Sequence, residues 1–219
     1  MIDFTLDGKH ITVFPGGRNS PVVYLPCFEE ISASFNLAVA FPHSLVCISN
    51  IDWDNELSPW PADGLMRHDS PFGGKGGTFL KWLCDQVIPA VENRLDEPGY
   101  RIIAGYSLAG LFAVYTVYQS DLFSRCVSAS GSLWYPGFVD YCAAHSFSSS
   151  LTHVYLSLGD KESLSRQPLL ASVGNCTQEI GHLFETQGIS TLMEWNPGSH
   201  FVDNEERMLK GIRWCLEQN

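Results

Sequence analysis

The stretch Tyr100-Arg-Ile-Ile-Ala-Gly-Tyr-Ser-Leu-Ala-Gly110 occupies the middle of the chain. It starts as a short apolar run typical of a buried strand and continues into Leu111-Phe-Ala-Val-Tyr-Thr-Val-Tyr118, which is typical of a helix. Ser107 stands at the junction, with small residues two positions before it and two and three positions after it. A serine at a sharp strand-to-helix turn requires small neighbours, because the strand and the helix pack closely there. The usual pattern has glycine at the position of Ala109, and we expect alanine to fit.

Strand-like and helix-like segments alternate along the rest of the sequence. Apolar or alternating runs predict a hairpin over residues 2–14 and strands over 21–25, 45–49, 102–104, 126–130, 153–158 and 190–195. Periodicity predicts helices over 31–40, 78–95, 111–118, 168–187 and 203–216. We expect Thr78 to cap the second of these helices, Pro89 to bend it, and Gly188 to end the fourth. The alternation predicts an α/β fold with a mostly parallel central sheet and helices on both faces, and we expect residues 1–219 to form a single domain.

Residues 50–77 form the longest segment without periodicity, rich in Pro, Gly, Asp and Trp. A long loop inside a compact domain is commonly functional. Its end, Gly73-Gly-Lys-Gly-Gly-Thr78, lacks the spacing of a phosphate-binding loop, so a flexible loop is the better interpretation. The sequence also has no H-E-x-x-H and no paired Cys/His spacing. We therefore expect neither a metal nor a cofactor.

Polar side chains follow the carboxyl ends of three predicted strands, where parallel sheets bind their ligands. Ser107 follows one strand, Asp160 and Glu162 follow a later one, and His200 follows the last. The order nucleophile, acid, base is that of the α/β-hydrolase triad, in which a histidine takes the serine proton and a carboxylate orients the imidazole. In hydrolases of this fold the acid often stands three residues after the glycine that closes the strand, which favours Glu162 over Asp160. A Ser–His dyad without an acid is an alternative, and Asp203 is a less favoured acid because it falls in the last helix.

An oxyanion hole requires two preorganised donors. The backbone N–H of Leu108, directly after the serine, is one candidate. The second is expected from the loop after the strand at 21–25, and since Pro26 has no N–H, either Cys27 or Phe28 must supply it. Cys27 is a poor candidate for the nucleophile, because no strand-to-helix turn follows it.

Four aromatic residues fall in loops at the expected edge of the site: Trp53, Trp60, Trp134 and Tyr135. They are predicted either to line an acyl or aromatic pocket or to roof the core. The structural alternatives for the main residues are a small serine in a tight turn at Ser107 and an ordinary loop histidine at His200.

The composition narrows the class of partner. A formal net charge of −11 disfavours nucleic acid and anionic membranes. The seven cysteines are odd in number and include no C-x-x-C pair, which predicts free, largely buried thiols in a reducing compartment. The N-terminus lacks the pattern of a signal peptide, and no apolar run has the length of a membrane span. We therefore expect a cytoplasmic protein.

Several segments, spread over about residues 20 to 216, match the pattern of one known group of proteins. They are the strand at 22–25, Glu56-Leu-Ser-Pro-Trp60, Val87-Ile-Pro-Ala-Val-Glu92, the 101–111 stretch, Ser130-Gly-Ser-Leu-Trp-Tyr135, Gly159-Asp-Lys-Glu162 and Pro197-Gly-Ser-His200. In these the chain resembles the esterase D-like group of α/β-hydrolases, which includes enterobactin-type siderophore esterases, feruloyl esterase domains and mycolyltransferases. The resemblance implies a serine esterase with Ser107 as nucleophile and His200 as base.

Two positions depart from the pattern of that group. Pro26-Cys27 stands where His-Gly is usual, and Ile51-Asp52 stands near the place where enterobactin-type members have an arginine for an anionic substrate. These departures disfavour a siderophore ester without excluding it, and we expect a compact esterase of small molecules that acts through an acyl-Ser107 intermediate, with its acyl and alcohol preference left open. The alternatives are acyl transfer or thioester hydrolysis on the same residues, or a hydrolase-fold binding protein without turnover.

Overall fold

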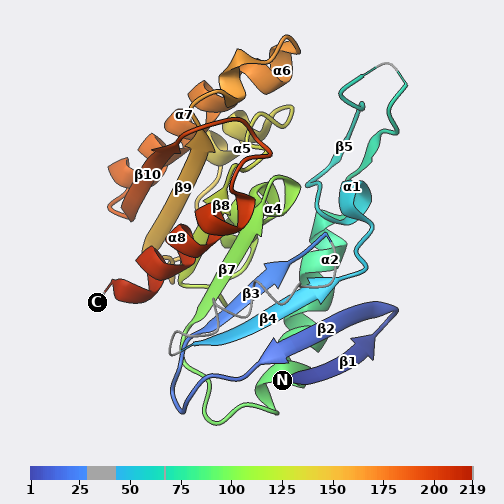
Figure 1. The fold of residues 1–219 in the computed structure, drawn as a ribbon, viewed down its shortest axis with the longest axis vertical. Coiled ribbons are helices and arrows are strands. Elements are labelled where there is room, and N and C mark those ends of the chain that lie inside the picture. The colour runs from blue at the N-terminus through green and yellow to red at the C-terminus, as the bar shows by residue number, and fades with distance from the viewer. Residues whose placement is uncertain (29–42, 67, 219) are drawn as a thin grey trace.

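A central sheet organises the computed structural model, which describes residues 1–28, 43–66 and 68–218 (Figure 1). In these residues the sheet has the strand order β1-β2-β4-β3-β7-β8-β9-β10. β1 pairs with β2 and β2 with β4 in antiparallel directions, and all the other neighbours are parallel. The strands are β1 (Ile2–Leu6), β2 (Lys9–Phe14), β3 (Val22–Pro26), β4 (Ser44–Ser49), β7 (Arg101–Tyr106), β8 (Arg125–Ala129), β9 (His153–Gly159) and β10 (Ser190–Asn196).

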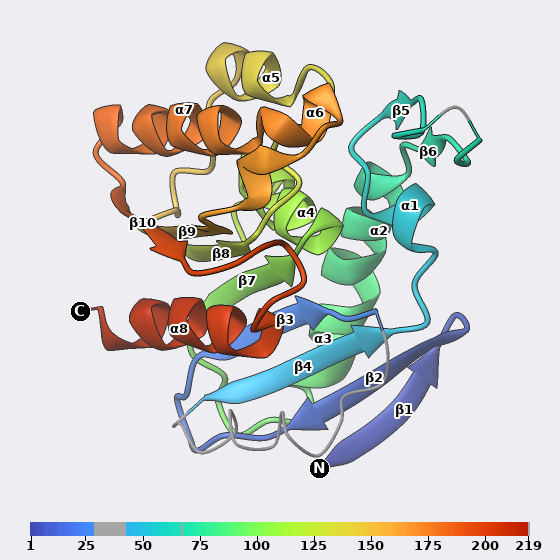
Figure 2. The same ribbon diagram turned by 45° about the horizontal axis from the view of Figure 1, so that its top comes forward.

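Helices cover both faces of this sheet (Figure 2). On one face α4 packs against β7 and β8 and α7 packs against β9 and β10, while α8 crosses β7, β8 and β9 on the other. The helices are α1 (Trp53–Glu56), α2 (Gly76–Trp82), α3 (Ile88–Glu92), α4 (Leu108–Gln119), α5 (Phe138–Ala144), α6 (Pro168–Ala171), α7 (Val173–Thr186) and α8 (Asn204–Glu217). The predicted parallel sheet with helices on both faces is thus confirmed.

Alternate residues of each central strand serve two cores, because successive side chains of a strand point to opposite faces. In β3, Val22 and Tyr24 belong to the larger core with α2, α3, α4 and α7, while Val23 and Leu25 belong to the smaller core under α8. Strands buried on both faces have continuous apolar sequences. This explains why their apolar runs predicted these strands correctly.

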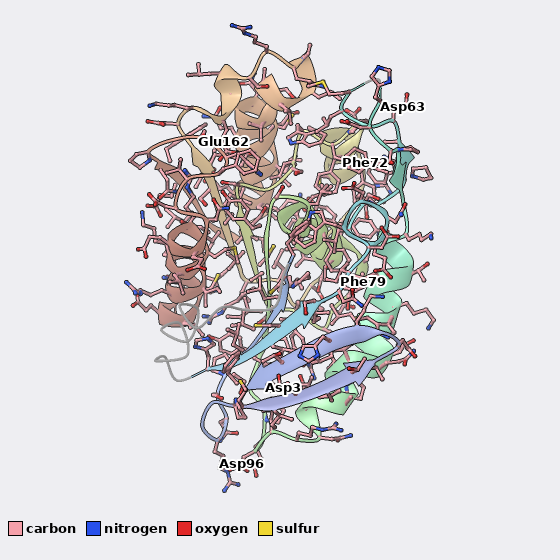
Figure 3. All side chains as sticks on the ribbon, turned by 45° about the vertical axis from the view of Figure 1, so that its right-hand side comes forward. Asp3, Asp63, Phe72, Phe79, Asp96 and Glu162 are labelled. Carbon is pink, nitrogen blue, oxygen red and sulfur yellow. The ribbon has the colours of Figure 1, made fainter. Side chains whose placement is uncertain are left out.

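The carboxyl ends of the parallel strands meet at one end of the molecule. Figure 3 shows Glu162, which follows β9, toward that end, and Asp96, which precedes β7, at the other. The described part of residues 50–77 also reaches this region and contains α1 and a small antiparallel pair, β5 (Pro61–Ala62) with β6 (Phe72–Gly73). The predicted long loop therefore has local structure of its own.

The predicted helix over 78–95 differs from the structure in three ways. It begins at Gly76, so Thr78 lies inside the first turn and the expected cap is wrong; Lys75 precedes the helix. A π-helical turn, η2 (Leu83–Val87), separates α2 from α3, and α3 ends at Glu92. Pro89 has no N–H with which to continue the α-helical ladder, so a wider turn before it is a physical consequence of its position.

Four further outcomes concern the other helices. The predicted helix over 168–187 is divided into α6 and α7 at Ser172, and α5 was not predicted. Gly188 has φ 85°, as expected of a residue that ends a helix. The helix predicted over 31–40 lies outside the described residues. Within the described ranges, none of the helices combines the length and hydrophobicity needed to cross a bilayer.

Candidate active site

Ser107 links the end of β7 to the start of α4. Its backbone has φ 58° and ψ −122°, a conformation that costs a residue with a Cβ on the order of 1–3 kcal/mol. Gly105 permits the turn, because a Cβ there would lie 2.0 Å from the carbonyl oxygen of Ala109. A Cβ on Gly110 would lie 2.9 Å from the Cα of Gly131, in the loop after β8. The predicted strand–serine–helix turn is confirmed, and Ala109 is accommodated fully buried within it.

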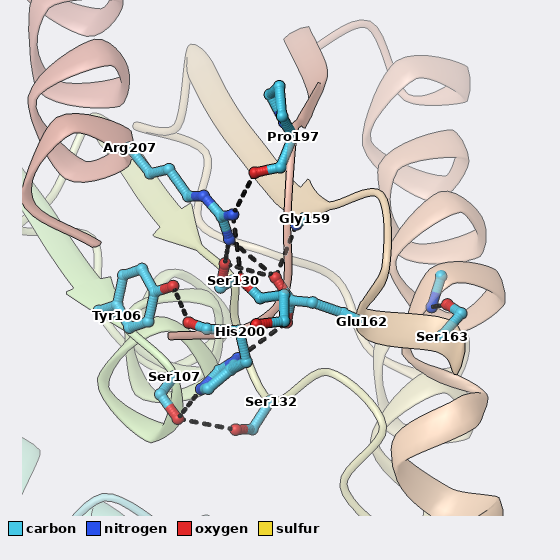
Figure 4. Close-up of polar contacts among 12 residues, drawn as sticks. Tyr106, Ser107, Ser130, Ser132, Gly159, Glu162, Ser163, Pro197, His200 and Arg207 are labelled. Atoms are coloured by element: carbon cyan, nitrogen blue, oxygen red, sulfur yellow. Dashed lines mark hydrogen bonds and ion pairs between the residues drawn. The ribbon is translucent and has the colours of Figure 1, made fainter. Parts of the chain in front are cut away.

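A line of hydrogen bonds joins three of the predicted residues (Figure 4). The Oγ of Ser107 lies 3.1 Å from Nε2 of His200, and Nδ1 of His200 lies 2.8 Å from Oε2 of Glu162. The Tyr106 hydroxyl donates to the carbonyl oxygen of His200 at 2.5 Å, which fixes the backbone of the histidine loop. An ionised Glu162 can only accept, so Nδ1 must carry the proton and Nε2 is free to accept the serine proton.

Asp160 lies apart from this line. Its carboxylate accepts a hydrogen bond from the N–H of Gly198 at 2.8 Å, and its own N–H donates to the carbonyl oxygen of Asn196. Asp160 therefore stabilises the crossing of the loops after β9 and β10 and does not contact His200. The structure brings Glu162, and not Asp160, to the histidine.

The second carboxylate oxygen of Glu162 is held by three donors. Its Oε1 accepts from the N–H of Gly159 at 2.6 Å, from the hydroxyl of Ser130 at 2.7 Å and from Nη1 of Arg207 at 3.1 Å. Burial alone would raise the pKa of Glu162, but the hydrogen bonds from His200, Gly159 and Ser130 outweigh it and lower that pKa below its ordinary value. The carboxylate is therefore ionised at neutral pH.

Sequence reasoning missed Ser130 and Arg207. Ser130 follows β8 with φ 45°, and Arg207 is 1% exposed in α8. The buried stripe of α8 is Arg207, Met208, Gly211, Ile212 and Cys215, so the arginine occupies a core position of the helix. A charged residue at such a position was the available signal, because an arginine is rarely buried without a partner.

The two expected oxyanion donors from the loop after β3 are not equivalent. The N–H of Cys27 donates to the carbonyl oxygen of Ile48 at 2.7 Å and extends the β3–β4 pairing by one residue. This N–H is therefore not free to bind an oxyanion, so of the two candidates the N–H of Phe28 remains. Phe28 is 72% exposed, and its ring packs edge-on against Trp53. Leu108 is the first residue of α4, where an N–H has no partner within the helix.

An open cavity of about 500 Å³ lies beside Ser107 and His200. Its wall is mainly apolar, and Lys161 is the only lysine or arginine among the described residues that form it. The remaining lining residues are Leu65, Ser130, Ser132, Trp134, Glu162, Leu164, Ser165, Leu170, Val173, Ser199 and Phe201. A wall of this kind favours a ligand that is largely apolar.

Of the four predicted pocket aromatics, only Trp134 lines this cavity. Tyr135 is 2% exposed, and its hydroxyl donates to the carbonyl oxygen of Trp60 at 2.6 Å. The Trp60 indole donates in turn to the carbonyl oxygen of Pro136 at 3.0 Å. Trp60 and Tyr135 therefore roof the core, and Trp53 packs on Phe28 outside the cavity wall.

Two further predictions concern thiols and metals. The seven cysteines are free thiols; Cys27, Cys84 and Cys176 are only partly buried. In the part of the chain that the structure describes, no group of three or more His, Cys, Asp or Glu side chains is arranged to hold a metal ion.

The sheet order, the helices on both faces and the serine turn define the fold of an α/β-hydrolase. The chain matches the model of the Esterase family, described as "Putative esterase", over residues 12–187. It therefore belongs to the Esterase family.

The chain resembles one curated protein in sequence and several solved structures in fold. It is similar to the uncharacterized protein YbbA of Bacillus subtilis (strain 168), with 28% identity over 140 residues, which make up 62% of this chain and 56% of that protein. The match thus spans little more than half the length of this curated relative. An IroE-like serine hydrolase from Shewanella oneidensis superposes with a TM-score of 0.80 at 16% identity, over 95% of this chain and 76% of that one. The siderophore hydrolase EstB from Aspergillus nidulans gives a TM-score of 0.70 at 18% identity, over 96% and 93%.

Proposed function

We propose that this chain hydrolyses carboxylic esters of small molecules through a covalent acyl-Ser107 intermediate. The observation that carries the proposal is the hydrogen-bonded line from Ser107 Oγ through His200 to Glu162 Oε2, beside an open apolar cavity. A serine hydroxyl becomes a nucleophile when a base within hydrogen-bond reach takes its proton. Membership of the Esterase family supports an ester as the substrate.

The reaction has two halves on the same residues. His200 Nε2 takes the hydroxyl proton while Ser107 Oγ bonds to the ester carbonyl carbon, and the carbonyl oxygen becomes an oxyanion. When the tetrahedral intermediate collapses, the bond to the alcohol oxygen breaks, and that oxygen takes the proton from His200. A water molecule then gives its proton to His200 and attacks the acyl carbon, so that the carboxylic acid leaves and Ser107 recovers its proton. Glu162 holds the proton on Nδ1 and stabilises the imidazolium.

We assign the oxyanion hole to the backbone N–H groups of Leu108 and Phe28. Leu108 directly follows the nucleophile at the N-terminus of α4, whose dipole favours negative charge. Of the two candidates in the loop after β3, Phe28 remains, because the N–H of Cys27 is bonded to Ile48. Losing one such donor typically lowers kcat by about 10²-fold to 10³-fold.

The cavity favours an ester whose acyl group is apolar and uncharged. Leu164 is 75% exposed and Phe201 84% exposed, and both border the cavity at its opening. Burying such side chains against a substrate is favourable in proportion to the apolar area removed from water. A siderophore ester is the second candidate substrate, because Lys161 places a cation at the same wall and one structural neighbour is named a siderophore hydrolase.

A fluorophosphonate probe tests the nucleophile. We expect the purified protein to be labelled and to hydrolyse p-nitrophenyl acetate, and Ser107→Ala to lose both the label and at least about 10⁴-fold of the turnover. Ser149→Ala is the matched control, because Ser149 is an exposed serine outside the cavity wall. Labelling that persists in Ser107→Ala would refute the assignment.

A panel of substrates separates the related activities. We compare acetyl, octanoyl, feruloyl and siderophore esters with thioesters of the same acyl groups, with and without an added alcohol as acceptor. The proposal expects hydrolysis of oxygen esters to give the highest kcat/KM. Faster thioester turnover, or transfer to the added alcohol in preference to water, would favour the alternatives, and no turnover with any of them would favour a binding protein.

A further inference from the structure

Arg207 reaches from α8 into the polar side of the site. Its Nη1 donates to Ser130 Oγ at 3.0 Å and to Glu162 Oε1 at 3.1 Å. Its Nη2 donates to the carbonyl oxygens of Pro197 at 3.0 Å and Ser199 at 3.1 Å. These acceptors follow β8, β9 and β10, so one guanidinium ties together the three strand exits that carry the acid and the histidine (Figure 4).

Burying this arginine costs free energy that its hydrogen bonds must offset. The side chain is 1% exposed, and its Nε has no hydrogen-bond partner in the described structure. Burying a charge with an unsatisfied donor costs free energy unless its remaining contacts compensate. All four contacts of Arg207 lead to residues that carry or flank the site, so these contacts explain why the arginine stands at a core position of α8.

Gly159 lies so close to the guanidinium of Arg207 that a side chain there would collide with it. A Cβ at this position would lie 2.9 Å from Nη2 and 3.0 Å from Nη1 of Arg207. The N–H of Gly159 also donates to Glu162 Oε1, beside the bond from Arg207. The absence of a side chain at the end of β9 thus lets the arginine and the carboxylate approach each other.

We propose that Arg207 is a positioning residue of the ester-hydrolysing site, holding the Glu162 carboxylate against His200 and fixing the loop that carries this histidine. The inference rests on the proposed function. Arg207 does not line the cavity, so it does not contact the substrate and acts through Glu162 and His200. Its removal should therefore change kcat and the pH dependence, with little change in KM for a small ester.

The direction of the pH effect follows from the charges around the His200–Glu162 pair. Among the described residues, the titratable groups next to this pair are Arg207 from α8 and Tyr106 from β7. Asp160 and Lys161 lie in the adjoining loop after β9, where Asp160 bonds to Gly198 and Lys161 lines the cavity. Burial raises the pKa of Tyr106, which therefore stays neutral. Removing the buried cation Arg207 makes the pair bind its proton more tightly, whichever of the two groups holds it. The acid limb of the activity profile then moves to higher pH.

The experiment follows the His200 imidazole by ¹⁵N NMR titration, assigned with His200→Asn, alongside kcat per fluorophosphonate-labelled site. In Arg207→Met we expect the titration midpoint to rise by about 1 pH unit and kcat for p-nitrophenyl acetate to fall about tenfold or more. In Arg207→Lys the charge remains but a single ammonium cannot reach four acceptors. We expect its midpoint to stay within about 0.3 unit, with kcat lowered about fivefold.

Arg125→Met is the matched control. Arg125 is also buried, but it bonds to the carbonyl oxygen of Cys215 and stacks on Tyr100, away from the cavity. We expect this variant to lose thermal stability without moving the His200 midpoint. A midpoint and kcat in Arg207→Met equal to those of the wild type would overturn the proposal. If that variant does not fold, wild-type kcat in Arg207→Lys would overturn it instead. Absent ester turnover in the wild type would refute the proposed function, while the titration would still decide the role of Arg207.

Discussion

The cavity has two contrasting sides. Behind His200 lies the polar floor, in which Ser130 and Glu162 line the cavity and Arg207 supports them from outside its wall. The carboxylate oxygens and both guanidinium Nη atoms are hydrogen-bonded there. In front lies the apolar rim, formed by Leu164, Leu170, Val173 and Phe201, of which Leu164 and Phe201 are mostly exposed. The floor is fixed before any substrate arrives, whereas Leu164 and Phe201 of the rim keep most of their surface free for a substrate to cover. Changes in the floor should therefore alter kcat for every ester, and changes in the rim should alter KM for large esters.

The largest effect is expected from the acid of the floor. In Glu162→Gln the donors Gly159, Ser130 and Arg207 hold the amide oxygen at the Oε1 position and turn the amide NH₂ toward the imidazole, which favours the wrong tautomer. We therefore expect kcat to fall by about 10³-fold to 10⁴-fold. Asp160→Asn is the matched control, because Asp160 bonds to Gly198 and not to the imidazole. Its kcat should stay within about threefold of the wild type. Steady-state kinetics on p-nitrophenyl acetate measures both, and equal small losses would indicate a Ser–His dyad.

Gly159→Ala should damage the floor without changing a charged group. The new Cβ would meet the guanidinium of Arg207 and lie 2.3 Å from the carbonyl oxygen of Gly198. We expect a loss of about 2–4 kcal/mol in the free energy of unfolding, with a lower kcat in the folded fraction. Urea denaturation measures the first effect. Gly77→Ala, in α2, is the control. Its Cβ would make only an ordinary contact, 3.4 Å from the Tyr115 hydroxyl. A wild-type stability for Gly159→Ala would contradict the close packing of Arg207.

The rim should discriminate by the length of the acyl group. Phe201→Ser and Leu164→Ser are each expected to raise KM for p-nitrophenyl octanoate about threefold to tenfold, because less apolar area is buried on binding. KM for the acetate ester should stay near the wild-type value in both variants. Its kcat should do so in Leu164→Ser, whereas Phe201 also packs edge-on against the His200 imidazole, so Phe201→Ser should lower kcat as well. Leu122→Ser, at an exposed leucine outside the cavity wall, is the control. An equal change with both esters would mean that the rim acts on the chemistry.

The smallest effect concerns stability against acid. The pKa of Glu162 is lower in the folded protein than its ordinary value, so its ionisation stabilises the fold above the unfolded-state pKa and is lost as the pH falls through the folded-state value. The wild type should therefore lose stability on acidification more steeply than Glu162→Gln does. Denaturation midpoints at a series of pH values from neutral to about 3 measure the difference. Parallel curves would show that the folded environment does not favour the carboxylate.

The sequence predicted those site residues that stand close behind a strand in the chain. Ser107 and His200 lie within a few residues of the strands that precede them, so a local pattern located both. Glu162 stands three residues after Gly159, which closes its strand, and this spacing favoured Glu162 over Asp160 as the acid. Arg207 could not be found in this way, since its role depends on how α8 crosses the sheet.

The choice between Cys27 and Phe28 depended on strand register. Pro26 of β3 pairs with Ile48 of β4, and this pairing engages the next N–H, that of Cys27. Parallel register is a long-range property, which a single strand sequence does not encode. The places of Trp60 and Tyr135 likewise depend on packing, because the Tyr135 hydroxyl donates to the Trp60 carbonyl oxygen and the Trp60 indole donates to that of Pro136 in the roof of the core.

The backbone of Ser107 has a consequence beyond the reaction. Its positive φ is a geometry that glycine adopts without strain, so Ser107→Gly would relieve the turn while removing the nucleophile. Under selection for folding alone, descendants of this chain would gain by exchanging the serine for glycine. A serine at this turn therefore destabilises the fold relative to glycine. We expect the lineage to retain it only while the reaction requires the hydroxyl.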